Sequence, residues 1–216
     1  QYFDPENGDQ LQTTLEATVQ YYLQKGMEEM CDAFSPANGA TGIIMDVRNG
    51  GILAMASYPT YDLNDFSTVS DKTLLERIQR GEIDTGDAQL IQWRNKALND
   101  TYEPGSTFKI LTLAAALEEG LIDQNTSVNC GGAVTISGQT IHCSNKAGHG
   151  LQTLKQTVGN SCNPAFISYG LKLGTEKFYQ YMRSFGLMSA TGIDLGGEAT
   201  GVFAADANFT QLDLAC

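Results

Sequence analysis

The spacing of hydrophobic residues in the first sixty positions predicts a helix followed by a β-hairpin. Between residues 17 and 30, four apolar side chains fall on one helical face: Val19, Leu23, Met27 and Met30. Two apolar runs, 41–47 (TGIIMDV) and 52–57 (ILAMAS), flank the segment RNGG. Because Asn-Gly tolerates the positive φ angles of a tight turn, these runs predict a pair of antiparallel strands. A short strand is also expected at 11–15 (LQTTL), before the helix.

Further elements follow along the chain. Residues 71–80 predict a solvated helix that is capped by Ser70 and ends before Gly81. The strongest helical signal covers 106–119, where the run ILTLAAAL is apolar on every face, so this helix is expected to be buried all round. A small hairpin is expected at 134–137 and 139–142, then helices at 151–158, 164–173 and 175–185, then a glycine-rich loop at 191–201. The last fifteen residues show no clear element.

Composition and charge narrow the class of protein. The chain has 216 residues, of which 42% are hydrophobic and 18% charged, as in a globular protein of one to one and a half domains. Thirteen basic against 25 acidic residues give a formal net charge of −12, which opposes binding to nucleic acid or anionic lipid. No apolar run approaches the roughly 18 residues that a bilayer span needs, and residues 1–10 do not resemble a signal peptide.

Ser106 and Lys109 are the first candidates for chemistry. Ser106 lies at the start of the apolar helix, where free backbone N–H groups favour developing negative charge. Lys109 lies three residues on and therefore on the same face. Burial disfavours the charged form of a lysine, and a neutral amine beside a serine is a general base beside a nucleophile. The alternative is that Ser106 caps the helix while Lys109 reaches solvent.

A second serine lies in the segment Ser161-Cys162-Asn163, between two expected helices. Its hydroxyl can relay a proton, and the Asn163 amide can hold a carbonyl or N–H group of a substrate. The alternative is that Ser161 or Asn163 caps the helix that begins at Pro164.

Histidine-dependent and phosphate-binding chemistries find little support. The two histidines, His142 and His149, lie in a glycine-rich region, and there is no G-x-S-x-G, G-x-x-x-x-G-K-[ST] or G-x-G-x-x-G motif. A zinc site from Cys130, His142, Cys143 and His149 can be drawn, but its ligand spacing matches no established pattern. No metal ion or cofactor is therefore expected.

The chain has five cysteines: Cys31, Cys130, Cys143, Cys162 and Cys216. Cys130 could pair with Cys143, or Cys143 with Cys162, in an oxidising compartment. Since free cysteines are often buried, the alternative is that all five are reduced and mostly in the core.

Taken together, these motifs resemble the class B penicillin-binding proteins. Residues 95–109 (NKALNDTYEPGSTFK) resemble the family's N-[RK]-A and Y-x-P-G-S-T-F-K pattern. Residues 41–66 resemble its hairpin and P-x-[YF]-D-x-N loop, S-C-N at 161–163 its S-x-N motif, and 191–201 (TGIDLGGEATG) its G-[IV]-D-L-x-G-E-x-x-G loop. The likeness runs from about residue 11 to the end, and the cysteines and the S-C-N form are most similar to the Gram-positive division and sporulation transpeptidases.

The resemblance implies an α/β (α+β) fold of the penicillin-binding-protein and serine β-lactamase-like transpeptidase type, with a helical cluster against an antiparallel sheet. It implies that Ser106 is acylated by the D-Ala-D-Ala stem peptide of peptidoglycan or by a β-lactam. Lys109 is then the base, Ser161 the proton relay and Asn163 the substrate-amide ligand. The backbone N–H of Ser106 supplies half of the oxyanion hole.

One departure from the family pattern concerns its third motif, K-[TS]-G, which is absent from this sequence. We therefore expect residues 1–216 to be a partial transpeptidase domain, with a lead-in strand and helix at 1–39 and the catalytic core through the S-x-N motif at 40–216. The expected consequences are missing C-terminal sheet strands, an incomplete and inactive site, and an exposed sheet edge that favours dimerisation. The alternatives are a non-catalytic penicillin-recognising or scaffold module and a serine β-lactamase, for which no deacylating base is identifiable.

The family likeness also carries expectations about location and partners. It places the protein on the extracytoplasmic face of the membrane, anchored by an N-terminal segment that this sequence does not contain. Other cell-wall synthesis proteins, in cell division or sporulation, are the expected partners. A Cys143–Cys162 disulfide beside the S-x-N motif could couple activity to redox state, or Cys162 could be a small buried filler.

Overall fold

The computed structural model describes residues 8, 10–203 and 210, so Cys216 and most of the last fifteen residues lie outside it. The chain divides into two compact units, Gln1–Asp100 and Thr101–Cys216, and each is described by itself. The sequence predicts a lead-in segment at 1–39 and a catalytic core at 40–216. That boundary divides one domain into segments and is a different division from the two compact units, so it stays a prediction.

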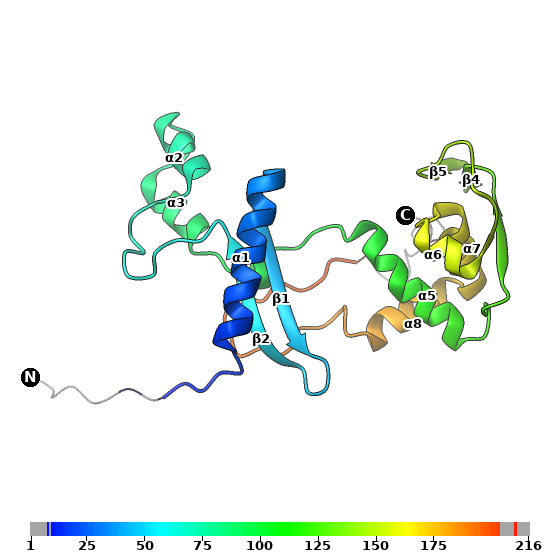
Figure 1. Ribbon diagram of the computed structural model, residues 1–216, viewed down its shortest axis with the longest axis horizontal. Helices are drawn as coiled ribbons and strands as arrows, with labels where there is room; N and C mark the ends of the chain where they lie inside the picture. The colour runs from blue at the N-terminus through cyan, green and yellow to red at the C-terminus, as the bar shows by residue number, and fades with distance from the viewer. Residues whose placement is uncertain (1–7, 9, 204–209, 211–216) are drawn as a thin grey trace, which may run out of the picture. The chain divides into compact units, whose positions relative to one another are not determined.

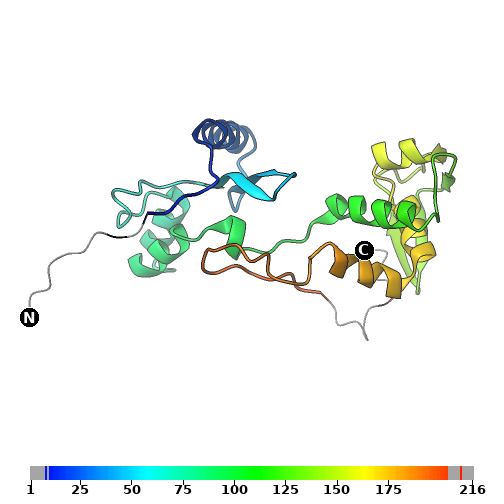
Figure 2. The same ribbon diagram turned by 90° about the horizontal axis from the view of Figure 1, so that it is seen from below.

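The first unit is built on a helix and a hairpin. Helix α1 (Ala17–Phe34) lies across one face of the antiparallel strands β1 (Ala40–Asp46) and β2 (Gly51–Tyr58), as Figures 1 and 2 show. A Cβ atom on Gly42 would lie 2.8 Å from the Leu23 side chain, so the helix packs directly on the strand backbone. The expected helix and hairpin are thus confirmed.

The strand expected at 11–15 is wrong, because these residues form no ladder with a neighbour. Thr14 instead donates its side-chain hydroxyl to the Ile52 carbonyl at 2.6 Å. Three of the five residues in this segment are polar, and the backbone runs beside β2 without pairing. Within the described residues, β1 and β2 pair only with one another.

Among the described residues of the first unit, three short helices follow the hairpin: α2 (Lys72–Gln79), α3 (Thr85–Gln92) and α4 (Lys96–Asn99). Helix α2 is capped by Asp71, whose carboxylate accepts from the N–H groups of Thr73 and Leu74, and not by Ser70 as expected. Ser70 is one residue too early, and its N–H bonds to the Gln92 side chain. The hydrophobic pattern did not predict α3 or α4, which are only two turns and one turn long.

The second unit begins with the segment that carries Ser106. The turn η1 (Gly105–Phe108) is a 3₁₀-helix that leads into α5 (Lys109–Glu118), so the expected helix exists but its first turn is tighter. The expectation of burial on every side is wrong. Ala115 and Ala116 are buried, but Ile110 is 68% exposed, because the described neighbours α7 and α8 cover only one side of α5.

In the described part of the second unit, four short strands form two separate antiparallel pairs. β3 (Ser127–Cys130) pairs with β6 (Gly150–Thr153), and the expected hairpin is confirmed as β4 (Ala133–Ile136) with β5 (Gln139–His142). A helix was expected at 151–158, but α6 (Leu154–Gly159) starts three residues later. Thr153 and Gln156 form a capping box, which fixes the helix start at residue 154 and leaves 150–153 extended.

Helices α7 (Asn163–Leu173) and α8 (Thr175–Ser184) are confirmed and form the core of the second unit with α5. Figure 2 shows α5 and α8 side by side, and the two meet through Ala115, Phe178 and Met182. α7 packs its Ala165, Phe166 and Tyr169 against the three buried cysteines that precede it. The two units together give the expected mixed α/β fold of helices and antiparallel strands. No helix in the described parts of the chain is both long and apolar enough to cross a membrane.

Candidate active site

Ser106 and Lys109 lie side by side, as their spacing predicted. Ser106 is exposed within η1, and Lys109 is the first residue of α5. The Lys109 Nζ lies 3.1 Å from the Ser106 Oγ. The capping alternative is wrong for this serine, since Pro104 and Phe108 precede η1 and α5 and neither helix start has a side-chain cap.

Lys109 also reaches the S-C-N segment of residues 161–163. Its Nζ lies 2.9 Å from both the carbonyl oxygen and the hydroxyl of Ser161, and 2.6 Å from the Asn163 Oδ1. The Phe166 ring centroid lies 5.5 Å from the same nitrogen. The lysine therefore points inward to join both motifs, and the alternative in which it reaches solvent is wrong.

The backbone of the S-C-N segment connects α6 to α7 through a short, hydrogen-bonded turn. The Cys162 N–H donates to the Thr157 carbonyl at the end of α6, and the Cys162 carbonyl accepts from Ala165 and Phe166 at the start of α7. Cys162 is therefore the N-cap residue, and it makes no side-chain cap. The side chains of Ser161 and Asn163 are not used as caps and turn to Lys109, so the capping alternative is wrong here as well.

Ser161 holds an unusual backbone conformation. Its φ is +46°, in the left-handed region that a serine enters at a cost of about 1 kcal/mol. The backbone bonds of the neighbouring Cys162 and the contact with Lys109 hold it there. Such strain is common where a side chain must be aimed at one point, and here the hydroxyl is aimed at the lysine amine.

Asn163 connects the amine to the neighbouring hairpin. Its Oδ1 accepts from Lys109, and its Nδ2 donates to the backbone carbonyl of His142 at 2.8 Å. Because each end of the amide has a partner, the orientation of the side chain is fixed. The carbonyl of His142 and the ring of Phe166 could not be predicted from the motifs, since both are brought to the site only by the fold.

The surroundings of Lys109 weaken its hold on a proton. Partial burial lowers the pKa of the amine, and the nearby Cys143 and Cys162 thiols oppose that shift. The carbonyl of Ser161 and the Oδ1 of Asn163 can only accept hydrogen bonds. A neutral amine satisfies both with its two N–H groups and keeps its lone pair for a serine hydroxyl. The geometry thus suits an amine that takes a proton from a hydroxyl.

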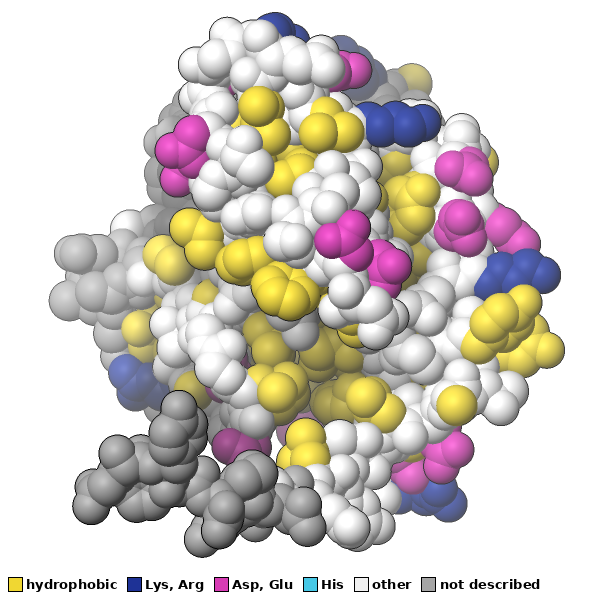
Figure 3. All heavy atoms as spheres, turned by 90° about the vertical axis from the view of Figure 1, so that its left-hand side faces the viewer, with side chains coloured by type: hydrophobic (Ala, Val, Ile, Leu, Met, Phe, Trp, Pro, Cys, Tyr) yellow, Lys and Arg dark blue, Asp and Glu magenta, His cyan; other side chains and the backbone are white. Residues whose placement is uncertain are grey.

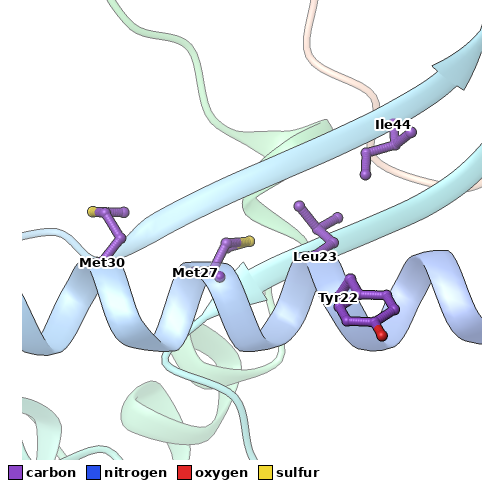
Figure 4. A pocket seen from close by; sticks show the side chains of 6 residues that line it. Tyr22, Leu23, Met27, Met30 and Ile44 are labelled. Carbon is purple, nitrogen blue, oxygen red and sulfur yellow. The ribbon is translucent and has the colours of Figure 1, made fainter.

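A groove in the first unit does not share this chemistry. Tyr22, Leu23, Met27, Met30 and Ile44 line it between α1 and β1, as Figure 4 shows. Its lining carries no titratable group apart from the Tyr22 phenol. Hydrophobic side chains also reach the surface at several places on the face drawn in Figure 3. Neither feature gathers the groups that a reaction needs.

Four other side chains of the second unit meet at one point. The sulfur atoms of Cys130, Cys143 and Cys162 and the ring of His149 lie within 4.8 Å of one another. Three of the four residues in the zinc set drawn from the sequence are present, but Cys162 replaces His142. The described cysteines, Cys31 included, are free and buried, so neither of the two disulfides drawn from the sequence is formed.

Comparison with known proteins supports the resemblance. Residues 40–214 match the family model of the penicillin-binding protein transpeptidase domain. Stage V sporulation protein D of Bacillus subtilis is 36% identical over 202 residues, which cover 93% of this chain and 28% of that protein. The peptidoglycan D,D-transpeptidase PbpA of Mycobacterium tuberculosis H37Rv is 30% identical over 191 residues, or 86% of this chain and 37% of that protein.

Solved structures agree in fold. The D,D-transpeptidase domain of a peptidoglycan glycosyltransferase from Eggerthella lenta is 28% identical with a TM-score of 0.74, over 93% of this chain and 44% of that chain. Penicillin-binding protein 3 of Mycobacterium tuberculosis, complexed with aztreonam, is 25% identical with the same TM-score, over 93% of this chain and 41% of that chain. The chain thus spans less than half the length of each of these relatives. By the family match and these likenesses, it belongs to the penicillin-binding protein transpeptidases, of the class B type.

Proposed function

We propose that the protein is a serine D,D-transpeptidase that cross-links peptidoglycan through an acyl-enzyme on Ser106. The observation that carries the proposal is the convergence of two hydroxyls and one amide on the Nζ of Lys109. Relatives that bear the name peptidoglycan D,D-transpeptidase support the reaction class, and the relative complexed with aztreonam supports recognition of β-lactams.

In the proposed acylation, the Ser106 Oγ attacks the carbonyl of the penultimate D-Ala while its proton passes to the neutral Lys109 amine. The tetrahedral intermediate collapses when the amide C–N bond breaks, and the leaving D-Ala nitrogen receives a proton. Ser161 is placed to deliver that proton, since its hydroxyl lies 2.9 Å from Nζ. The backbone N–H of Ser106 is the proposed donor to the developing oxyanion.

In the proposed second half, an acceptor amine from a neighbouring stem peptide attacks the ester at Ser106. The same groups transfer protons in the opposite direction. Lys109, through Ser161, takes the proton of the attacking amine and returns one to the Ser106 oxygen. Asn163 is proposed to bind a substrate amide, and its contact with the carbonyl of His142 sets the direction of its side chain. The proposed location is the extracytoplasmic face of the membrane, where peptidoglycan is cross-linked.

The test is a product analysis with a synthetic stem peptide that ends in D-Ala-D-Ala, plus an acceptor amine, using the complete gene product. Release of D-Ala together with the amide-linked peptide pair is the expected result. The Ser106→Ala variant is expected to abolish both products, and Ser189→Ala, which changes an exposed serine elsewhere in the second unit, to leave them unchanged.

Other outcomes reject the proposal. Hydrolysis of a β-lactam with rapid turnover would assign the protein to the serine β-lactamases. Binding of penicillin without covalent attachment or product would assign it to the non-catalytic modules.

A further inference from the structure

The cluster of Cys130, Cys143, His149 and Cys162 is drawn from four separate places in the second unit. Cys130 ends β3, Cys143 follows β5, His149 precedes β6, and Cys162 is the N-cap of α7. The cysteines are 1%, 3% and 0% exposed, and His149 is half-buried. The fold therefore brings three thiols and one imidazole together inside the protein.

The dimensions of the cluster suit a tetrahedral metal ion. A zinc ion with Zn–S bonds of about 2.3 Å has ligand-to-ligand edges of roughly 3.7 Å. The Cys143 Sγ lies 3.5 Å from the His149 Nδ1, and no ligand pair exceeds 4.8 Å. Closing the longest edge needs a contraction of about one ångström, which side-chain rotation can supply.

The backbone around the cluster brings the ligand-bearing loops into contact. A Cβ atom on Gly148 would lie 2.3 Å from the Cys130 carbonyl oxygen, and one on Gly132 would lie 2.2 Å from the Lys146 carbonyl oxygen. Both glycines have positive φ. The loop that follows β3 and the loop between β5 and β6 thus touch backbone to backbone, and only glycine permits that approach.

Hydrogen bonds also fix the loop that carries Cys143 and His149. The Asn145 side chain closes its own turn by accepting from the Ala147 N–H and donating to the Gly148 carbonyl. A loop closed in this way keeps its two candidate ligands in position, as the surroundings of a metal site do.

Two simpler explanations of the cluster leave some of its features unexplained. Small buried thiols can fill a core, but that does not explain why an imidazole nitrogen lies 3.5 Å from one of them. A disulfide can join two of the three cysteines, but it leaves the third and the histidine without a role. A closed set of three thiolates and one imidazole is a typical structural zinc site, and soft thiolate ligands disfavour magnesium and calcium.

We propose that Cys130, Cys143, His149 and Cys162 bind one zinc ion in a closed structural site. Binding releases a proton from each thiol as it becomes a thiolate. The ion joins β3, the loop between β5 and β6, and the start of α7, three parts of the unit that are otherwise connected by short ladders and loops.

The site has a consequence for catalysis, and this consequence rests on the proposed function. Cys162 lies between Ser161 and Asn163, the two residues that contact Lys109. A zinc–sulfur bond at Cys162 therefore anchors the backbone that aims both side chains. Asn163 is held from the same region a second time, through the carbonyl of His142, the residue before Cys143.

The first experiment measures the metal directly and does not depend on catalysis. The protein is purified with a thiol reductant and without chelator, dialysed against Zn²⁺, and its metal content is determined by mass spectrometry. One zinc ion per chain is expected. Replacement by Co²⁺ is expected to give the visible absorption of a tetrahedral cobalt–thiolate centre. Wild-type protein that retains no zinc and shows no cobalt spectrum would overturn the proposal.

Matched variants assign the ligands. His149→Gln and Cys162→Ser are expected to weaken cobalt binding by at least the roughly tenfold that loss of an outer-shell partner costs. His142→Gln and Cys31→Ser, which change a histidine and a buried cysteine outside the cluster, are expected to bind cobalt as the wild type does. Equal loss in the ligand and control variants, or peptide mapping that finds a disulfide among the three cysteines in metal-treated protein, would overturn the assignment. Metal bound without acylation would refute the proposed function and leave the site standing.

Discussion

The Nζ of Lys109 lies 2.9 Å from the hydroxyl of Ser161, although 52 residues separate the two in the chain. Lys109 begins α5, and Ser161 lies between α6 and α7. The contact brings the two motifs together into one proton-transfer group, because the same nitrogen is 3.1 Å from the Ser106 hydroxyl. Each hydroxyl can exchange a proton with the amine, so one base can serve both the nucleophile and the leaving group.

Removing the Ser161 hydroxyl tests the relay. Ser161→Ala keeps the backbone carbonyl that also bonds to Lys109 and leaves Cys162 in place. We expect acylation by a fluorescent penicillin to slow by about 10²-fold or more, the low end of the range for a general acid or base. The matched control is Ser127→Ala, on the exposed side of β3. Acylation by Ser161→Ala at the control rate would remove Ser161 from the mechanism.

The pH dependence tests the state of Lys109. Partial burial lowers the pKa of its amine below the ordinary 10.5, and only the neutral amine can accept the Ser106 proton. The acylation rate constant is expected to rise with pH, with a midpoint below 10.5. In the same window the unfolded chain binds more protons than the folded one, so this group makes the free energy of unfolding rise with pH. A stopped-flow profile with no rise, or with a midpoint at or above that of free lysine, would show that Lys109 is not the base that takes the Ser106 proton.

A buried pair of hydroxyls stabilises the packing of α6 on α7. The Tyr169 hydroxyl lies 3.0 Å from the Thr157 Oγ1, and both residues are fully buried. Tyr169→Phe is expected to lower the free energy of unfolding by about 1 kcal/mol, since Thr157 keeps its bond to the Leu154 carbonyl. Tyr102→Phe, at a side chain that is 80% exposed, is the control. Urea denaturation measures both, and equal stabilities would show that the pair contributes nothing.

Alanine substitutions at two glycines distinguish the cost of a strained φ angle from the cost of a clash with a neighbouring backbone. Gly138 and Gly148 both have positive φ, but a Cβ atom meets nothing within 4 Å at Gly138 and lies 2.3 Å from the Cys130 carbonyl oxygen at Gly148. Gly138→Ala is expected to cost about 1 kcal/mol and Gly148→Ala about 3 kcal/mol or more. Thermal unfolding of the two variants checks the difference. Similar losses would mean that the two loops do not touch as described.

The hydrophobic pattern correctly predicted the features that depend only on residues close together in the chain. The β1–β2 hairpin follows from apolar runs around Asn-Gly, and the Ser106–Lys109 pair follows from one turn of helix. The hydrophobic pattern places the start of α6 three residues too early. The helix begins where the capping box at Thr153 ends the strand, and the hydrophobic pattern does not show that box. The pattern also overstated the burial of α5, since exposure of Ile110 depends on which elements pack there.

Contacts across long stretches of chain could not be read from spacing. Sequence likeness associated Ser161 and Asn163 with Lys109, but not their distances or the supporting carbonyl of His142. The metal-capable cluster shows the same limit. Three of its members were recognised as candidate ligands, whereas Cys162 belonged to another motif, and only the packing of α7 brings its sulfur to the other three.

The intact mass of the protein after incubation with benzylpenicillin shows directly whether Ser106 is the nucleophile. A stable adduct with the mass of one penicillin is expected on the peptide that contains Ser106, and it is expected to be absent in Ser106→Ala. The Ser189→Ala control is expected to carry the adduct as the wild type does. An adduct that persists in Ser106→Ala, or a complete gene product that shows none, would contradict the assignment of Ser106 as the nucleophile.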